Sequence, residues 1–242
     1  MFYLIGLGLN VKSITADALE ILKTCSKIYL ENYTVNFPYS FNELEKSLGT
    51  KITPLDRKNV ENELIVEESK KQNVALLVYG DPLSATTHTQ LILACKKQKV
   101  KYKIFHNASI LTTVGETALS LYKFGKTTSM PDWSEHTNKP TSFINYIREN
   151  LSIKAHTLLL VDIDLEFQNA VKQLKEASEK EKVKLPEKII VLSSAGTEKQ
   201  KIFYTALDEL ENKKIILPFC FIIPSEMNFF EEESVNLFFN KF

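Results

Sequence analysis

The chain has 242 residues, of which 44% are hydrophobic, and its 30 Lys and Arg residues balance 30 Asp and Glu residues. A net charge of zero gives no global electrostatic attraction to nucleic acid or to an anionic membrane, so we expect neither as a partner. The longest apolar stretch, Ile215 to Ile223, is interrupted by Pro218 and is far shorter than the ~20 residues that cross a bilayer. The length allows one large or two modest globular domains.

The cysteines and the N-terminus indicate a reducing compartment. Cys25, Cys95 and Cys220 are odd in number and widely separated, and no Cys-x-x-Cys pair or His spacing suits zinc. We therefore predict no metal. The apolar run from Met1 to Gly6 has no basic leader and is too short for the core of a signal peptide. We expect a cytoplasmic protein.

Short apolar runs alternate with amphipathic stretches along the whole chain. This alternation predicts βα units around a mainly parallel sheet, so the predicted fold class is α/β. In the first half we expect a helix over Ala16 to Cys25 with Thr15 as its cap, and a helix that begins near Thr87. The expected strands of this half are Phe2 to Ile5, Lys27 to Leu30, a short piece near Ile52, Val74 to Val78, and Tyr102 to His106.

A boundary between residues 110 and 130 would divide the chain into domains of 1–112 and 113–242. The expected strands of the second half are Thr157 to Val161, Ile189 to Ser193, Lys201 to Tyr204 and Phe219 to Ile223. The expected helices are Thr141 to Asn150, Glu166 to Lys180 and Thr205 to Glu211.

The C-terminal segment is rich in phenylalanine. We expect Phe229, Phe230, Phe238 and Phe239 to pack a final helix onto the core or onto a dimer mate. Glu231 to Glu233 would then face water.

The stretch from Tyr79 to Thr89, Tyr-Gly-Asp-Pro-Leu-Ser-Ala-Thr-Thr-His-Thr, lies between a buried strand and an amphipathic helix. In an open α/β sheet, such a loop lies at the carboxyl end of a strand, where ligands bind. Gly80 frees the backbone, Pro82 restrains it, and Asp81 offers a carboxylate to hydroxyl groups or a cation. Because Gly-Asp-Pro also forms ordinary turns, a ligand loop and a plain turn remain equal alternatives on this pattern alone.

The start of the following helix carries several polar side chains. Thr86 or Thr87 can cap its free amides. His88 could act as a base, but a hydrogen-bonding role at the helix end is the favoured interpretation.

Four other loops with small or polar residues follow predicted strands. The first contains Gly-Leu-Gly, but it is not a dinucleotide fingerprint, because Val11 occupies the place of the third glycine. In the second, Ser109 can cap a helix whose free amides near Ile110 would favour a carboxylate. The loops are Gly6 to Leu9, His106 to Ile110, Val161 to Asp164 and Ser193 to Gly196.

Five segments together resemble the diphthine synthase family, in the same order along the chain. Gly-Asp-Pro-Leu-x-Ala-Thr-Thr-His is specific to that family, whereas Gly-Leu-Gly and Gly-Asp-Pro are shared with the broader class typified by tetrapyrrole methylases. The resemblance covers the whole chain. The segments are Tyr3 to Leu9, Tyr79 to Thr89, His106 to Ile110, Leu121 to Lys126 and His156 to Ile163.

The resemblance implies two α/β domains of the tetrapyrrole-methylase type with the cofactor cleft between them. It implies an S-adenosylmethionine-dependent methyltransferase, acting in diphthamide biosynthesis as a homodimer and releasing S-adenosylhomocysteine. The implied acceptor is the amino group of the modified histidine, 2-(3-carboxy-3-aminopropyl)-histidine, of translation elongation factor 2. The implied cofactor contacts, several of them through the backbone, are Leu9, Asp81, Ser84, Ser109, Ile110, Val161, Ala195 and Phe219.

Methyl transfer from a sulfonium to an amine requires neither a metal nor a covalent nucleophile, so positioning carries most of the catalysis. We nominate no catalytic base from the sequence.

Two alternative functions remain open from the sequence. One alternative keeps the fold and cofactor but changes the acceptor to a tetrapyrrole or an RNA ribose. Another is a binding protein without turnover, because the second half departs from the family pattern, for example with Pro218-Phe219 where Pro-His is usual.

Overall fold

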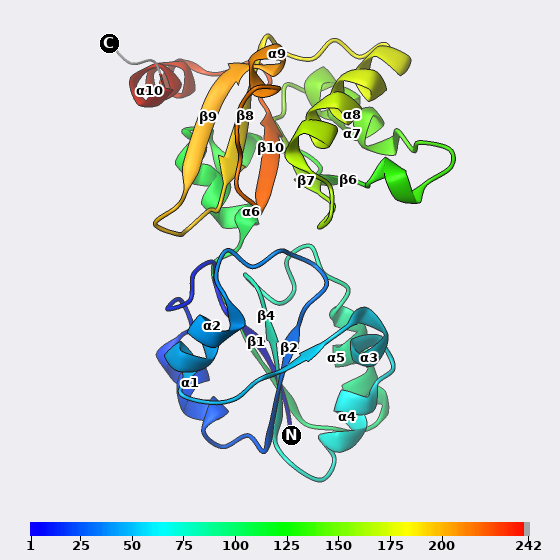
Figure 1. Ribbon diagram of the computed structural model, residues 1–242, viewed down its shortest axis with the longest axis vertical. Helices are drawn as coiled ribbons and strands as arrows, with labels where there is room; N and C mark the ends of the chain where they lie inside the picture. The colour runs from blue at the N-terminus through cyan, green and yellow to red at the C-terminus, as the bar shows by residue number, and fades with distance from the viewer. Residues whose placement is uncertain (240–242) are drawn as a thin grey trace. The chain divides into compact units, whose positions relative to one another are not determined.

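The structure is a computed structural model that describes residues 1–239. It contains two compact units, Met1–Ile110 and Leu111–Phe242. Within the described residues each unit is built on one five-stranded sheet (Figure 1). No helix in residues 1–239 has both the length and the apolar character that a membrane span requires.

The first sheet is entirely parallel, as the alternation of strands and helices predicts. Its strand order is β3-β2-β4-β1-β5, so β1 lies between β4 and β5. All residues of β1 and β4 are buried, which explains their continuous apolar sequences. The strands are β1 (Phe2–Gly6), β2 (Lys27–Glu31), β3 (Thr53–Leu55), β4 (Val74–Val78) and β5 (Tyr102–Phe105).

Helices cover both faces of this sheet, with α1 and α2 on one face and α3, α4 and α5 on the other (Figure 1). Thr15 caps α1 as predicted, because its side chain accepts a hydrogen bond from the Ala18 N–H at 3.3 Å. The helices are α1 (Ala16–Leu22), α2 (Phe41–Leu48), α3 (Arg57–Glu61), α4 (Leu64–Glu68) and α5 (Thr89–Lys97).

The predicted threonine cap of α5 is wrong. The N-cap position is held by His88, without a side-chain cap hydrogen bond. The Thr86 hydroxyl instead donates to the Pro82 carbonyl at 2.7 Å.

The second sheet is mixed, so the prediction of mainly parallel pairing is wrong for this unit. Its order is β6-β7-β10-β8-β9, and β6-β7 is parallel while the other three pairs are antiparallel. The loop 194–200 between β8 and β9 is too short for the crossover that a parallel connection needs. The strands are β6 (Thr128–Met130), β7 (Thr157–Val161), β8 (Lys188–Ser193), β9 (Lys201–Ala206) and β10 (Phe219–Ile223).

The helices α7 and α8 contribute Phe143, Ile147, Phe167 and Leu174 to the core of this unit. The helix predicted from Thr205 begins later, at Leu207, because β9 continues through Ala206 in pairing with β8. The helices are α6 (Ile110–Thr113), α7 (Ser142–Ser152), α8 (Phe167–Lys180), α9 (Leu207–Leu210) and α10 (Phe229–Phe239), with short 3₁₀ turns η1 (Val114–Thr117), η2 (Leu121–Lys123) and η3 (Trp133–Glu135).

The helix α10 differs from the prediction in two respects. Phe229, Phe230 and Phe238 are 71%, 75% and 67% exposed, so they do not pack onto the core of this chain. Glu231, expected to face water, is only 3% exposed. Its buried carboxylate is stabilised by contacts with Lys123 and His156.

Candidate functional site

Three loops meet at the carboxyl edge of the first sheet, because they follow the neighbouring strands β4, β1 and β5. The loops after β1 and β4 are joined by a reciprocal backbone pair: Gly8 N–H donates to the Gly80 carbonyl, and Gly80 N–H donates to the Gly8 carbonyl, both at 3.0 Å. In a parallel sheet this edge is where ligands bind. The loop cluster is therefore the candidate site of the first unit.

Glycines permit this close approach of loops. A Cβ on Gly6 would lie 2.6 Å from the Gly80 carbonyl oxygen and 2.9 Å from Cδ of Pro82. Gly8 has φ of +71°, in the left-handed region that side chains disfavour. The Gly-x-Gly pattern thus serves the packing of loop against loop.

Asp81 connects the loop after β4 to the loop after β5. Its Oδ1 accepts hydrogen bonds from the Leu83 N–H at 3.0 Å and the Ser84 hydroxyl at 3.3 Å. Its Oδ2 accepts from Nδ1 of His106 at 2.8 Å and from the Asn107 N–H at 3.1 Å. Burial alone would raise the pKa of Asp81, but these donors outweigh burial and hold the pKa below its ordinary value.

The pairing of Asp81 with His106 was missed by the sequence reasoning. The two residues are 25 positions apart, and only the adjacency of the three strands brings their loops together. The one available signal was that both residues come at or just after the ends of predicted strands.

Two further side chains tie the cluster to the loop after β1. The Asn107 side-chain amide donates to the carbonyls of Gly6 at 3.1 Å and Ser13 at 2.9 Å. The Tyr79 hydroxyl donates to the Leu9 carbonyl at 3.0 Å. The three loops therefore form one hydrogen-bonded unit.

His88 lies beside this cluster but is enclosed, with 2% of its surface exposed. Its Nδ1 is 3.1 Å from the Pro82 carbonyl oxygen. Burial lowers the pKa of this imidazole, so the neutral ring with a protonated Nδ1 donates to that carbonyl. This is a hydrogen-bonding role at the start of α5, the interpretation favoured from the sequence.

All five first-unit residues nominated from the sequence lie in or beside the loop cluster. Leu9 is 5% exposed and Ser109 is 5% exposed, while Ile110 begins α6. A Cβ on Gly80 would lie 3.6 Å from Cβ of Ser109, so the loop after β5 approaches the loop after β4 here as well.

The three nominated residues of the second unit gather at one end of its sheet. Val161 ends β7, Phe219 begins the antiparallel neighbour β10, and Ala195 follows the end of β8. Phe219 pairs with Ser193, and the Ser194 N–H donates to the Pro218 carbonyl at 2.8 Å. Antiparallel pairing thus brings together residues that are far apart in the sequence.

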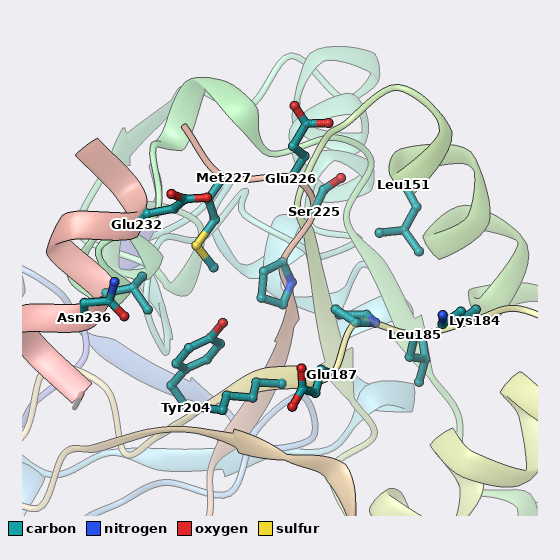
Figure 2. Close-up of a pocket in the computed structure, with 14 residues that line it drawn as sticks. Leu151, Lys184, Leu185, Glu187, Tyr204, Ser225, Glu226, Met227, Glu232 and Asn236 are labelled. Atoms are coloured by element: carbon teal, nitrogen blue, oxygen red, sulfur yellow. The ribbon is translucent and has the colours of Figure 1, made fainter. Parts of the chain in front are cut away.

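The second unit also has an open groove of about 860 Å³, which contains none of the nominated residues. Tyr204 of β9 and Glu232 and Asn236 of α10 line one part, and Figure 2 shows Met227 projecting into the space between them. Leu151 and Lys184 lie across the groove from α10 (Figure 2). Among residues 1–239, no cluster of three or more His, Cys, Asp or Glu side chains is arranged to hold a metal.

The chain is similar to known proteins over its full length. The family described as Tetrapyrrole (Corrin/Porphyrin) Methylases matches residues 1–211. The diphthine methyl ester synthase of Schizosaccharomyces pombe is 34% identical over 271 aligned positions, which cover 98% of this chain and 95% of that protein. The Homo sapiens diphthine methyl ester synthase is 42% identical over 172 residues, which cover 70% of this chain and 60% of the human protein.

A solved structure extends the similarity to three dimensions. The crystal structure of a diphthine synthase superposes with a TM-score of 0.89 at 30% identity, covering 99% of this chain and 96% of the other. The similarity therefore includes both sheets and the loops that follow their strands.

Proposed function

Because the chain belongs to the tetrapyrrole methylase family, and within it to the diphthine methyl ester synthases, we propose that it methylates the modified histidine of translation elongation factor 2. The enzymes of this family are S-adenosylmethionine-dependent methyltransferases. The observation that carries the proposal is the 34% identity to a diphthine methyl ester synthase over 98% of this chain.

The proposed acceptor atoms are the amino nitrogen and the carboxylate oxygen of the aminocarboxypropyl group. The amine is the acceptor that the resemblance to the diphthine synthase family implies, and the carboxylate follows from the relatives' name, which specifies a methyl ester. When bound, S-adenosylmethionine supplies an electrophilic methyl carbon on a sulfonium, which leaves as a neutral thioether. The acceptor's lone pair forms the new bond to that carbon, so the protein's task is to align the acceptor and exclude water.

The loop cluster suits such a cofactor. It offers the Ser84 hydroxyl, backbone groups of Leu9, Ser109 and Ile110, and glycine backbone without Cβ atoms where the loops approach one another. The Asp81 carboxylate already accepts four hydrogen bonds, so we propose that it holds the loops in place and provides negative charge near the sulfonium.

We propose Val161, Ala195 and Phe219 as the contribution of the second unit to cofactor binding. Their position at one sheet end supports this assignment. We also propose that the domains comprise residues 1–112 and 113–242. We propose a cytoplasmic location, because elongation factor 2 acts in the cytoplasm.

We propose that the chain forms a homodimer through α10. Its exposed phenylalanines Phe230 and Phe238 lie on one side of a helix that is otherwise anchored by Glu231. Large contiguous apolar surface is uncommon on monomers and is typical of interfaces.

The test is transfer of labelled methyl from S-adenosylmethionine to purified elongation factor 2 that carries the aminocarboxypropyl-histidine precursor, with unmodified factor as control. We expect label only on the precursor form. Mild alkali should then release one fraction as methanol, from the ester, and leave the N-methyl fraction on the protein. Cofactor binding without any labelling would refute the proposed reaction and favour a binding protein.

A further inference from the structure

His106 is held at one ring nitrogen and open at the other. Its Nδ1 lies 2.8 Å from Oδ2 of Asp81, and its side chain is 66% exposed. Because an ionised carboxylate only accepts hydrogen bonds, Nδ1 carries the proton in the neutral ring and Nε2 carries the lone pair. The same carboxylate oxygen accepts the Asn107 N–H, so Asp81 is itself fixed in orientation.

We propose that Nε2 of His106 is the base that removes the proton from the acceptor amine, with Asp81 as its positioning residue. This assignment rests on the proposed function. The amine of the acceptor has a reference pKa of about 8, so most of it is protonated at neutral pH and has no lone pair to attack with. Imidazole is the side chain whose ordinary titration range suits the removal of that proton.

The proton and electron balance of the step is complete. One N–H bond of the ammonium breaks, the proton passes to Nε2 of His106, and the freed nitrogen lone pair forms the bond to the methyl carbon. The carbon–sulfur bond breaks with its electron pair going to sulfur. The proton on Nε2 later passes to water. Ester formation needs no such base, because a carboxylate is already ionised at neutral pH.

The other histidines do not offer this arrangement. The chain has four. His88 is 2% exposed and His156 is 0% exposed, and His156 has both ring nitrogens engaged, with Glu231 and with the Ser225 N–H. His136 is exposed, but it follows η3 in the second unit and is not in the loop cluster. Among the described residues, Asp81 is the ionisable side chain that contacts His106.

The test compares two substitutions at this position. His106→Asn keeps an N–H near the place of Nδ1, so Asp81 retains its donor, but it removes Nε2. His106→Ala removes both. His136→Asn is the matched control, because it makes the same change at an exposed histidine outside the cluster. Methyl transfer to precursor-bearing elongation factor 2 is measured from pH 6.5 to 9.5, beside titration calorimetry with S-adenosylmethionine.

We expect His106→Asn to bind the cofactor as the unaltered protein does and to transfer methyl to the amine about 10²-fold more slowly at pH 7. The deficit should shrink toward pH 9.5, because the acceptor then loses its proton to solvent. His106→Ala should also bind the cofactor more weakly, and His136→Asn should match the unaltered protein in both assays.

Two results would overturn the assignment alone: an undiminished rate in His106→Asn, or a deficit that is equal at pH 7 and pH 9.5, which would indicate a merely structural contact. If the unaltered protein leaves the precursor unlabelled, the proposed function fails, and the role of His106 fails with it.

Discussion

Nε2 of His156 lies 3.1 Å from Oε1 of Glu231, and neither side chain is more than 4% exposed. The Ser225 N–H donates to Nδ1 of His156 at 2.9 Å, so Nε2 carries the proton and donates to the carboxylate. Lys123 Nζ lies 2.6 Å from Oε2 of the same Glu231. This cluster ties α10 to η2 and to the residue that precedes β7, and Glu231 is its centre.

Removing the charge of Glu231 should destabilise the fold. Glu231→Gln leaves Lys123 without its counter-charge and turns one acceptor oxygen into a donor facing other donors. We expect a loss of about 2 to 3 kcal/mol in the free energy of unfolding, measured by urea denaturation. Glu233→Gln, on the exposed face of α10, is the matched control and should change it by less than about 0.5 kcal/mol. Equal losses in both variants would contradict the anchoring role.

The stability that Glu231 provides should depend on acidity. Burial alone would raise the pKa of this carboxyl, but Lys123 and the N–H donors hold it to about 2 in the folded protein, against 4.5 for the free group. A lowered folded pKa gives stability that is present above pH 4.5 and is lost as the pH falls toward 2. The difference between the unaltered protein and Glu231→Gln should therefore shrink by about 2 kcal/mol from pH 6 to pH 3. The stability difference between the two proteins is measured by urea denaturation at pH 6 and at pH 3. An equal difference at both pH values would show that the charge of Glu231 does not cause the stabilisation.

Gly8 and Gly49 provide a matched pair for the loop contacts. Their φ values are +71° and +67°, but a Cβ on Gly8 would lie 2.5 Å from Cβ of Ser13 and 2.9 Å from Oδ1 of Asn107, whereas nothing lies within 4 Å at Gly49. Gly49→Ala should cost about 1 kcal/mol from backbone strain alone. Gly8→Ala should cost about 3 kcal/mol and weaken S-adenosylmethionine binding, because the loops must move apart. Thermal unfolding measures the stability of the two variants, and calorimetry measures their binding of S-adenosylmethionine. Equal stability and equal binding in Gly8→Ala and Gly49→Ala would contradict a role for Gly8 in the loop contacts.

Asp81→Ala should weaken cofactor binding while the fold is retained. The change removes the acceptor of four hydrogen bonds that join the loops after β4 and β5. We expect at least a tenfold rise in the dissociation constant of S-adenosylmethionine by calorimetry, about 1.4 kcal/mol, with an unchanged circular dichroism spectrum. Asp17→Ala, an exposed aspartate of α1, is the control. Unchanged affinity in Asp81→Ala would remove this residue from the site.

Self-association should depend on the apolar face of α10. Phe230 and Phe238 are eight residues apart, so they lie on one side of the helix, and both are exposed. The double change of Phe230→Ser and Phe238→Ser should shift the protein from dimer to monomer in light scattering coupled to size exclusion. Ile153→Ser, at an exposed isoleucine after α7, should leave the mass unchanged. A dimer that survives the double change would place the interface elsewhere.

Much of the strand framework could be predicted from the sequence. Val74–Val78, Thr157–Val161 and Phe219–Ile223 were predicted with the bounds they have in the structure. Each is a short apolar run ended by a polar or turn residue, and burial on the sheet requires that local pattern. The short strand β6 was missed, because Thr128–Met130 is too brief to show any periodicity.

The family signature and the polar loops after the strands were also present in the sequence, because loop chemistry is local. What the tertiary structure decided is which distant groups meet. Residue types along the chain do not show that Asp81 pairs with His106 or that Glu231 is buried against His156. The physical reason is that strand order and register set these contacts. Strand order and register depend on how all the helices and strands pack around a shared core, and the residue types and spacing within one segment do not determine that packing.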